Sequence, residues 1–130
     1  MQSNKFDQIT LLITHYNRSK SLERLLEAFS KQKIVFGDVV VSDDGSADEQ
    51  IAYLHHIQKV HNFRIIGTKK NAGLGNNINK GQKAIHTPYT LYVQEDFNPF
   101  SGYSKHLQDA LDIMNEKPEI DLVRFYAYFK

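Results

Sequence analysis

The sequence predicts an α/β fold in three layers, with a mainly parallel sheet of about five strands and helices on its faces. Short apolar runs alternate with amphipathic segments of helical length from one end of the chain to the other. Two of the runs end in acidic pairs, Asp43-Asp44 and Glu95-Asp96. A buried strand cannot hold adjacent carboxylates, because an unpaired charge away from water is costly. Each strand must therefore leave the core at its acidic pair, and such strand ends line the ligand crevice of an open parallel sheet.

Five apolar runs are expected to form the strands. They are short and bounded by polar residues, and the valines of the second suit a sheet interior. The last run reaches the final residue, and nothing follows that would cap it. We therefore expect residues 1–130 to be a single domain cut from a longer protein. The expected strands cover residues 9–14, 38–42, 63–67, 89–94 and 122–129.

Four segments carry the apolar spacing or the boundary signals of helices. The second is expected to begin at a capping box, Ser46-Ala47-Asp48-Glu49, because Ser and Glu at this spacing satisfy free helix amides. The third is rich in asparagine, a poor helix former, and is expected to end before Pro88. The expected helices cover residues 19–32, 46–61, 75–86 and 103–114.

Composition and charge exclude several classes of protein. The 16 basic and 15 acidic residues give a net charge of +1, so there is no electrostatic reason to expect nucleic acid as a partner. No apolar run is long enough to span a bilayer, and the polar first eight residues do not form a signal peptide. The chain has no cysteine, which excludes disulfides and thiolate metal sites. We expect a cytoplasmic protein.

Polar segments follow four of the expected strands and contain the candidate binding residues. In the loop at residues 14–18, Tyr16 can stack on a planar base and Arg18 can contact phosphate. Asp44 can accept a hydrogen bond from the imide N–H of uracil. Glycines in the segment 71–81 let backbone approach a ligand. A carboxylate after the fourth strand can hold Mg²⁺ or Mn²⁺ while the ion bridges two phosphates. Each segment also has a structural explanation, as a helix cap or a solvated surface.

In this order and spacing, the four segments resemble the donor half of inverting family 2 glycosyltransferases, which have the GT-A fold. The resemblance covers nearly the whole chain. It implies a donor domain that binds a nucleoside-diphosphate sugar, most simply a UDP-sugar, with Mn²⁺ or Mg²⁺. It further implies inverting transfer to a hydroxyl of a carbohydrate or lipid-linked acceptor, as in polysaccharide biosynthesis. The matching segments are residues 9–18, 39–46, 71–81 and 91–96.

The resemblance also implies roles for single residues. Asp44 would bind the uracil, Asp96 the metal, and Glu95 would face the ribose or the donor sugar. None of the residues of this chain matches the family's catalytic base, which is expected beyond Lys130. The implied nucleotide-binding residues are Thr14, His15, Tyr16, Asn17, Arg18, Asp43, Asp44, Gly73 and Asn79.

Three positions depart from the family pattern. His15 stands where a small residue is more usual, and Gln94 replaces the first carboxylate of the metal motif. Ile78 stands where an arginine is common. One phosphate contact is therefore either missing or supplied by Lys69, Lys70 or Lys80.

Other functions remain open alternatives. A non-catalytic nucleotide-binding module with the same fold is the strongest, and the last strand could also drive self-association through an exposed face. A dehydrogenase is suggested by the glycines at residues 73–78. However, Ile78 replaces the third glycine, and the motif follows the third strand instead of the first. A phosphoacceptor domain would need its acidic pair after the first strand, where this chain has Thr14-His15.

Overall fold

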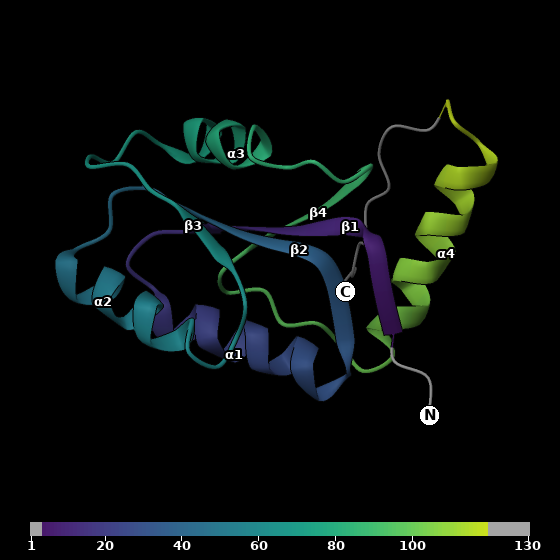
Figure 1. Cartoon of the computed structure of the whole chain (residues 1–130), viewed down its shortest axis with the longest axis horizontal. Helices are drawn as coiled ribbons and strands as arrows, with labels where there is room; N and C mark the ends of the chain where they lie inside the picture. Colours follow the sequence, from purple (N-terminus) through teal and green to yellow (C-terminus); the bar gives the residue numbers. More distant parts are fainter. Residues whose placement is uncertain (1–3, 120–130) are drawn as a thin grey trace, which may run out of the picture. The chain divides into compact units, whose positions relative to one another are not determined.

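The computed structural model describes residues 4–119, and these residues form a four-stranded sheet and four helices in strict alternation (Figure 1). The chain divides into two compact units, the first ending at Pro99 and the second starting at Phe100. The first unit holds the whole sheet, and the second holds the last helix. The α/β class is confirmed, while the fifth strand expected at 122–129 lies outside the described residues. The elements are β1 (Asn4–His15), α1 (Ser19–Lys31), β2 (Ile34–Asp43), α2 (Asp48–Ile57), β3 (Arg64–Ile66), α3 (Leu74–Gln82), β4 (Tyr89–Gln94) and α4 (Tyr103–Glu116).

All strands of the sheet are parallel, in the order β3-β2-β1-β4. Strands β2 and β3 are added in turn on one side of β1, and the chain then crosses to the other side of β1 to form β4. The direction of winding thus reverses between β1 and β4. Thr14 lies opposite both Ser42 and Gln94, so three strands end together at one edge. In open α/β sheets, ligands bind outside the carboxyl ends of the strands at such a reversal.

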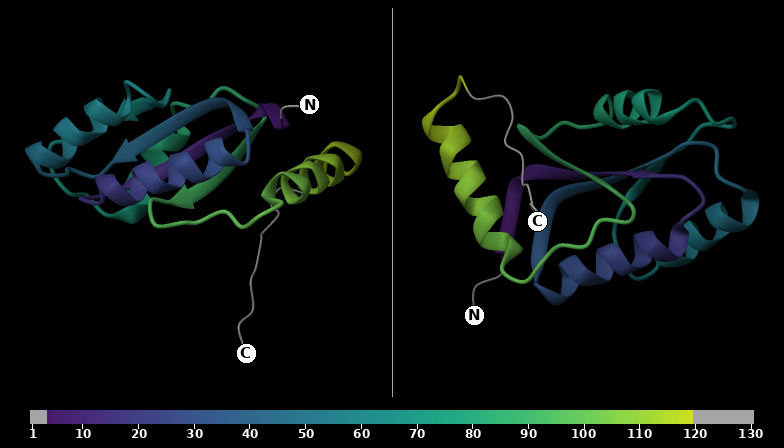
Figure 2. Two further views of the ribbon diagram at one scale, coloured as in Figure 1. Left: turned by 90° about the horizontal axis from the view of Figure 1, so that it is seen from below. Right: turned by 180° about the vertical axis from the view of Figure 1, so that it is seen from behind.

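Helices cover both faces of the sheet. Figures 1 and 2 show α1 and α2 on one face and α3 on the other, which gives the expected three layers. The apolar side of α1 is buried at the helical spacing that the sequence predicts. Each fully buried side chain of this size contributes about 1.5–3 kcal/mol. The buried residues of α1 and the centre of β1 are Leu22, Leu25, Leu26 and Phe29, with Leu11, Leu12 and Ile13. Within residues 4–119, no helix combines the length and apolar character needed to cross a bilayer.

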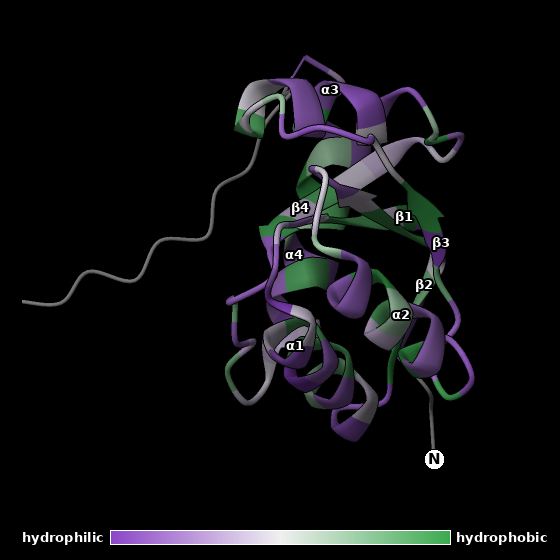
Figure 3. Cartoon of the chain, turned by 90° about the vertical axis from the view of Figure 1, so that its left-hand side faces the viewer, coloured by the Kyte–Doolittle hydropathy of each residue, from purple (hydrophilic) through white to green (hydrophobic). Residues whose placement is uncertain are grey.

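The polar helix α3 is held by a close approach and by a buried polar pair. Figure 3 shows α3 as mostly hydrophilic above apolar central strands. A Cβ at Gly81 would lie 2.5 Å from Leu12 Cδ1 and 3.1 Å from Ser42 Cβ, so glycine lets the helix reach the sheet. Asn77 is 2% exposed; its Nδ2 donates to the Ser42 carbonyl (2.9 Å), and its Oδ1 lies 2.7 Å from the Ser42 hydroxyl. The helix ends at Gln82, earlier than expected.

The first strand starts at Asn4, well before the expected residue 9. Phe6 is buried and pairs with Phe36, and the register shifts between Phe6 and Thr10. The two strands bend together in this region (Figure 1). A Cβ on Gly37 would lie 2.2 Å from the Asp7 carbonyl oxygen, so glycine is required at the bend. The irregular register interrupts the apolar alternation, which is why the sequence pattern misses this part of the strand.

The expected capping box of the second helix is wrong. Helix α2 begins at Asp48, and its N-cap residue Ala47 makes no side-chain cap hydrogen bond. The Ser46 hydroxyl is instead engaged with Asp43, to which it donates at 2.5 Å. The acidic residues Asp48 and Glu49 still occupy the first turn, where the helix dipole favours them.

Strand β3 covers only part of its neighbour. Its three residues pair with Val40, Val41 and Ser42 of β2. In the preceding part of β2, Asp38 accepts the backbone N–H of its own neighbour Val39 (2.8 Å). The other carboxylate oxygen accepts from Arg64 Nη2 at 2.6 Å.

Gly81→Ala is expected to destabilise the fold by about 1–3 kcal/mol, because the added methyl overpacks the contact between α3 and the fully buried Leu12. Gly75→Ala is the matched control on the same helix. Nothing lies within 4 Å of its Cβ position, and alanine there should stabilise by up to about 1 kcal/mol. Urea denaturation measures both free energies of unfolding, and equal effects would contradict the close approach.

Candidate functional site

Hydrogen bonds tie the loops after β1 and β2 into one unit at the carboxyl edge of the sheet. The Asn17 amide donates to Ser46 Oγ (2.9 Å), and the Ala47 amide donates to Asn17 Oδ1 (2.8 Å). The Asp44 amide donates to the His15 carbonyl at 3.0 Å. Asn17 has a φ of 53°, a conformation that asparagine tolerates better than most residues. The two loops therefore form a continuous rim beside the end of β4.

A buried pair, His15 and Asp43, lies beneath this rim. His15 Nδ1 lies 2.8 Å from Asp43 Oδ1, and the side chains are 0% and 2% exposed. The Arg18 backbone N–H donates to His15 Nε2 at 3.1 Å, which requires a lone pair on that nitrogen. The proton of the neutral ring is therefore on Nδ1, and Nδ1–H donates to Asp43.

The carboxylate of Asp43 is stabilised in its charged form. Its Oδ2 accepts the Ser46 amide (3.0 Å), and its Oδ1 accepts the Ser46 hydroxyl in addition to His15. Burial by itself raises the pKa of Asp43, but the hydrogen bonds from His15 and Ser46 outweigh it and bring the pKa below its usual value. The sequence places His15 and Asp43 among the nucleotide contacts, whereas the structure buries both and pairs them with each other.

Asp44 faces the opposite way, toward the loop that follows β3. Its Oδ1 accepts the Ala72 amide (2.7 Å), and its Oδ2 accepts the Gly73 amide (3.1 Å). The side chain is only 5% exposed. A carboxylate has about four lone-pair positions, so each oxygen can still accept a further donor. A Cβ on Gly45, whose φ is +75°, would lie 2.7 Å from the Asn71 nitrogen, so the two loops touch through backbone.

Glu95 links the end of β4 to the loop after β1. Its Oε2 accepts the Tyr16 amide at 3.1 Å across the reversal point of the sheet. Burial raises the pKa of Glu95, and the hydrogen bond from Tyr16 opposes the rise. Asp96, the next residue, is open to solvent: its side chain is 58% exposed, and one oxygen lies 3.9 Å from Arg18 Nη1. An exposed pair at this distance contributes little to stability, so Asp96 remains available to a ligand.

The acidic residues at this edge suit a metal site in which the substrate supplies some of the ligands, and they do not form a site made of protein ligands alone. Residues 4–119 contain no group of three or more His, Asp or Glu side chains arranged to hold a metal ion. Asp96 and the second oxygen of Glu95 are hard donors at adjacent positions. Mg²⁺ and Mn²⁺ accept one or two protein carboxylates and take their other ligands from substrate phosphates and water. These residues therefore suit an ion that arrives with a phosphate ligand.

The other expected binding residues differ in accessibility. Tyr16 is 45% exposed, whereas Thr14 is 3% exposed, with its hydroxyl 2.9 Å from the Tyr92 hydroxyl. Gly73 is exposed, with a φ of +94° that suits glycine, and it stands at the N-terminus of α3. Asn79 is exposed on α3. Thr14, Tyr16, Asp44 and Asp96 thus belong to one edge of the sheet.

Three residues at this edge were not among the expected binding residues: Ser46, Asn77 and Tyr92. Lys80, expected as a possible phosphate contact, instead donates from Nζ to the Asp43 carbonyl. Burial lowers the pKa of Lys80, and the charges of Asp43 and Asp44 oppose that change. For Asn77 the sequence signals were the polar character of the third expected helix and its place in the matching segment 71–81.

Comparison with known proteins identifies the family. The model described as "Glycosyl transferase family 2" matches residues 10–129. The chain belongs to glycosyl transferase family 2. This assignment agrees with the resemblance of the four strand-end segments and with the open parallel sheet.

Individual relatives of this family 2 chain are distant. Poly-β-1,6-N-acetyl-D-glucosamine synthase of Staphylococcus epidermidis is 22% identical over 95 residues, which are 73% of this chain and 23% of the relative. The synthase of Staphylococcus aureus strain COL is 25% identical over 93 residues, with 72% and 23% covered. The chain thus spans about a quarter of the length of the curated relatives it matches.

Solved structures agree on the fold. Staphylococcus aureus TarS 1–349 superposes with a TM-score of 0.67 at 25% identity, covering 84% of this chain and 32% of that one. The same protein in complex with UDP gives 0.65, with the same identity and coverage. A mannosyltransferase of Pyrobaculum calidifontis, in complex with GDP-Man and Mn²⁺, gives 0.70 at 16% identity, covering 82% and 32%, and supports the fold alone.

Asp43→Asn is expected to lower the free energy of unfolding of the family 2 chain by about 1.5–3 kcal/mol at neutral pH. The Asn amide group would face the Ser46 N–H that the carboxylate accepts. Because the folded pKa of Asp43 is depressed, its contribution is complete above the unfolded value of 3.8 and is lost as the pH falls through the folded value.

Urea denaturation of the wild type and of Asp43→Asn, from neutral pH down to acid, measures how the difference in stability changes with pH. The difference in stability should shrink in acid, whereas Asp7→Asn, at a side chain 71% exposed, should give a small difference throughout. A difference for Asp43→Asn that grows in acid would contradict the assignment.

Proposed function

We propose that this chain is the donor-binding part of a glycosyltransferase and binds a UDP-sugar together with a divalent metal. The observation that carries the proposal is that Tyr16, Asp44 and Asp96 follow three parallel strands, β1, β2 and β4, whose carboxyl ends lie at one edge of the sheet. This arrangement offers an aromatic ring, a base-reading carboxylate and a metal-binding carboxylate in one place. The TarS structure with UDP supports uridine as the nucleoside.

The base is read by Asp44 and stacked by Tyr16. The exposed Tyr16 ring offers an apolar face to a planar base. Asp44 accepts the imide N–H of uracil as an added hydrogen bond, while its amide contacts to Ala72 and Gly73 hold it in position. Adenine has an acceptor nitrogen in the corresponding part of its pairing edge, so the carboxylate disfavours it.

The diphosphate and the metal are placed at Asp96. Asp96 would hold Mn²⁺ or Mg²⁺, and Arg18 stands beside it as a further cation for phosphate oxygens. When bound, the ion offsets the negative charge that develops on the departing nucleoside diphosphate. Glu95 also fixes the Tyr16 amide, so the residue that faces the sugar positions the residue that stacks on the base.

Transfer itself requires a group outside the donor site. Inversion needs a base that deprotonates the acceptor hydroxyl as it attacks the anomeric carbon. We assign none of the carboxylates at this edge to that role, because each has a partner in the loops or a place at the diphosphate. The base is expected in sequence beyond Lys130, together with the site for a carbohydrate or lipid-linked acceptor. Residues 1–130 alone are therefore expected to bind donor without transferring sugar.

A nucleotide-binding module without transferase activity is the second candidate. It is favoured by Gln94, which stands where the family's metal motif has its first carboxylate. Acceptor-dependent sugar transfer by a longer protein that contains this chain would exclude it. Binding of UDP with no transfer to any acceptor would favour it.

Asp44→Asn is expected to weaken UDP binding by about 10- to 100-fold and to remove the preference for UDP over ADP, because it breaks a charge-assisted hydrogen bond. Isothermal titration calorimetry measures both affinities, and a thermal melt shows whether the variant is folded. Asp48→Asn, an exposed acidic residue of α2, is the charge-matched control and should bind as wild type. Equal affinity of wild type for UDP and ADP would refute the role of Asp44.

UDP affinity is expected to fall when EDTA removes Mn²⁺, and Asp96→Ala should abolish this metal dependence. The diphosphate supplies most of the metal ligands, so ion and nucleotide should bind together and each weakly alone. Calorimetric titrations of UDP with and without Mn²⁺ test this for wild type, Asp96→Ala and the control Asp48→Ala. Wild-type affinity that EDTA leaves unchanged would disprove the metal role.

A further inference from the structure

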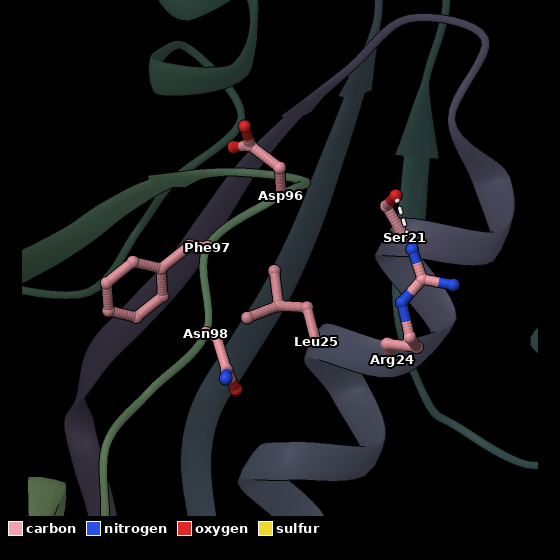
Figure 4. Close-up of a pocket in the computed structure, with 6 residues that line it drawn as sticks. All are labelled: Ser21, Arg24, Leu25, Asp96, Phe97 and Asn98. Carbon is pink, nitrogen blue, oxygen red and sulfur yellow. Dashed lines mark hydrogen bonds between the residues drawn. The ribbon is translucent and has the colours of Figure 1, made fainter.

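A small cavity with a mixed polar and apolar lining lies between the start of α1 and the segment that follows β4. Its volume is about 220 Å³, and Figure 4 shows its lining side chains. Three come from the helix and three from the facing segment. They are Ser21, Arg24 and Leu25, with Asp96, Phe97 and Asn98.

The chemistry of the lining favours an anion. Arg24 Nη2 donates to Ser21 Oγ at 3.0 Å, and the guanidinium has no carboxylate partner in residues 4–119. A guanidinium carries five N–H donors, so most of its donors remain available. Asn98, exposed on the facing segment, offers a carboxamide. The apolar part of the lining comes from Phe97 and from the nearly buried Leu25, which lies between Asn98 and Arg24 in the view of Figure 4.

Asp96 is the single acidic residue in the lining. Its carboxylate lies near Arg18, which is not part of the cavity. The cation of the cavity and its one acidic neighbour are therefore not paired with each other. An anionic group that enters can bind Arg24 without displacing an ion pair made by Arg24.

Size and position restrict the ligand further. Pockets for whole drug-sized ligands measure about 300–1,000 Å³, so this cavity suits one small unit and not a nucleotide. Asp96 also belongs to the proposed site for metal and diphosphate. A group in the cavity would therefore lie next to the proposed metal and diphosphate site, because both include Asp96.

We propose that this cavity is a subsite for an anionic group, a carboxylate or a phosphate, carried by a carbohydrate substrate. Arg24 is the cation that binds the group, and Asn98 adds a neutral donor. This inference rests on the proposed function, because the cavity shares Asp96 with the proposed site for metal and diphosphate. The group belongs either to the donor, as in a uronic acid, or to the acceptor, as in a phosphorylated sugar.

Two measurements on the whole chain test the subsite. Calorimetry with Mn²⁺ compares UDP-glucuronate with UDP-glucose, and NMR follows the Arg24 side-chain Nε–H during titration with glucuronate, glucose 6-phosphate or glucose. Arg24→Gln removes the charge and keeps donors. Lys20→Gln removes an exposed charge from the same helix without touching the cavity and is the matched control.

A donor anion predicts that UDP-glucuronate binds about tenfold more tightly than UDP-glucose, the effect of one charge-assisted contact. Arg24→Gln should abolish this preference, and Lys20→Gln should keep it. If the anion belongs to the acceptor, UDP-glucuronate and UDP-glucose should bind with equal affinity. The Arg24 NMR signal should then shift on addition of glucose 6-phosphate and not on addition of glucose.

Failure of the subsite is distinct from failure of the proposed function. If UDP binds while no anionic sugar is preferred and none shifts the Arg24 signal, the subsite is refuted and donor binding stands. An anion effect that survives in Arg24→Gln, or that Lys20→Gln reduces equally, also refutes it. If UDP does not bind at all, the proposed function fails and the subsite assignment fails with it.

Discussion

The hydrogen bond from His15 to Asp43 joins the two central strands where both leave the core, and the rim of the sheet is built on it. Asp43 takes the His15 proton donor and the Ser46 hydroxyl on one oxygen and the Ser46 amide on the other. The Ser46 hydroxyl in turn receives the Asn17 amide. A buried carboxylate is tolerated because donors surround it. Its partners thereby fix the loops that carry Tyr16 and Asp44, so a buried pair sets the positions of two candidate binding residues.

The fold was predictable where a segment buries one continuous apolar stripe. The spacing of Leu22, Leu25, Leu26 and Phe29 located α1, and β4 was predicted at its observed limits of Tyr89–Gln94. The prediction failed where tertiary contacts replace the stripe. The start of β1 is hidden by the register shift before Thr10, and α3 is held by Gly81 and Asn77, whose roles depend on Ser42 and Leu12 across the interface. Such contacts join residues far apart in sequence and leave no local period.

The site was predictable as a location and less so as a set of roles. Parallel strands bring their carboxyl ends to one edge, so acidic pairs after two strands were sufficient to identify that edge. Sequence alone could not assign separate roles to Asp43 and Asp44. Adjacent residues at a strand end point in opposite directions, and the sequence does not say which one points inward. One is turned inward to His15, and the other toward the Ala72 and Gly73 amides. Ser46 was misassigned for a different reason: a hydroxyl near a helix start can cap the helix or bind another side chain, and here it donates to the buried carboxylate of Asp43.

The short third strand has a consequence for the behaviour of this domain at high concentration. Since β3 pairs only with Val40, Val41 and Ser42, the earlier part of β2 is left without that neighbour. Open edges of this kind recruit strands from other molecules and start aggregates. Here the Asp38 carboxylate occupies the Val39 amide, which a foreign strand would need, and with Arg64 it sets charge along the edge. The aspartate thus leaves one backbone donor fewer for edge-to-edge pairing on this part of β2.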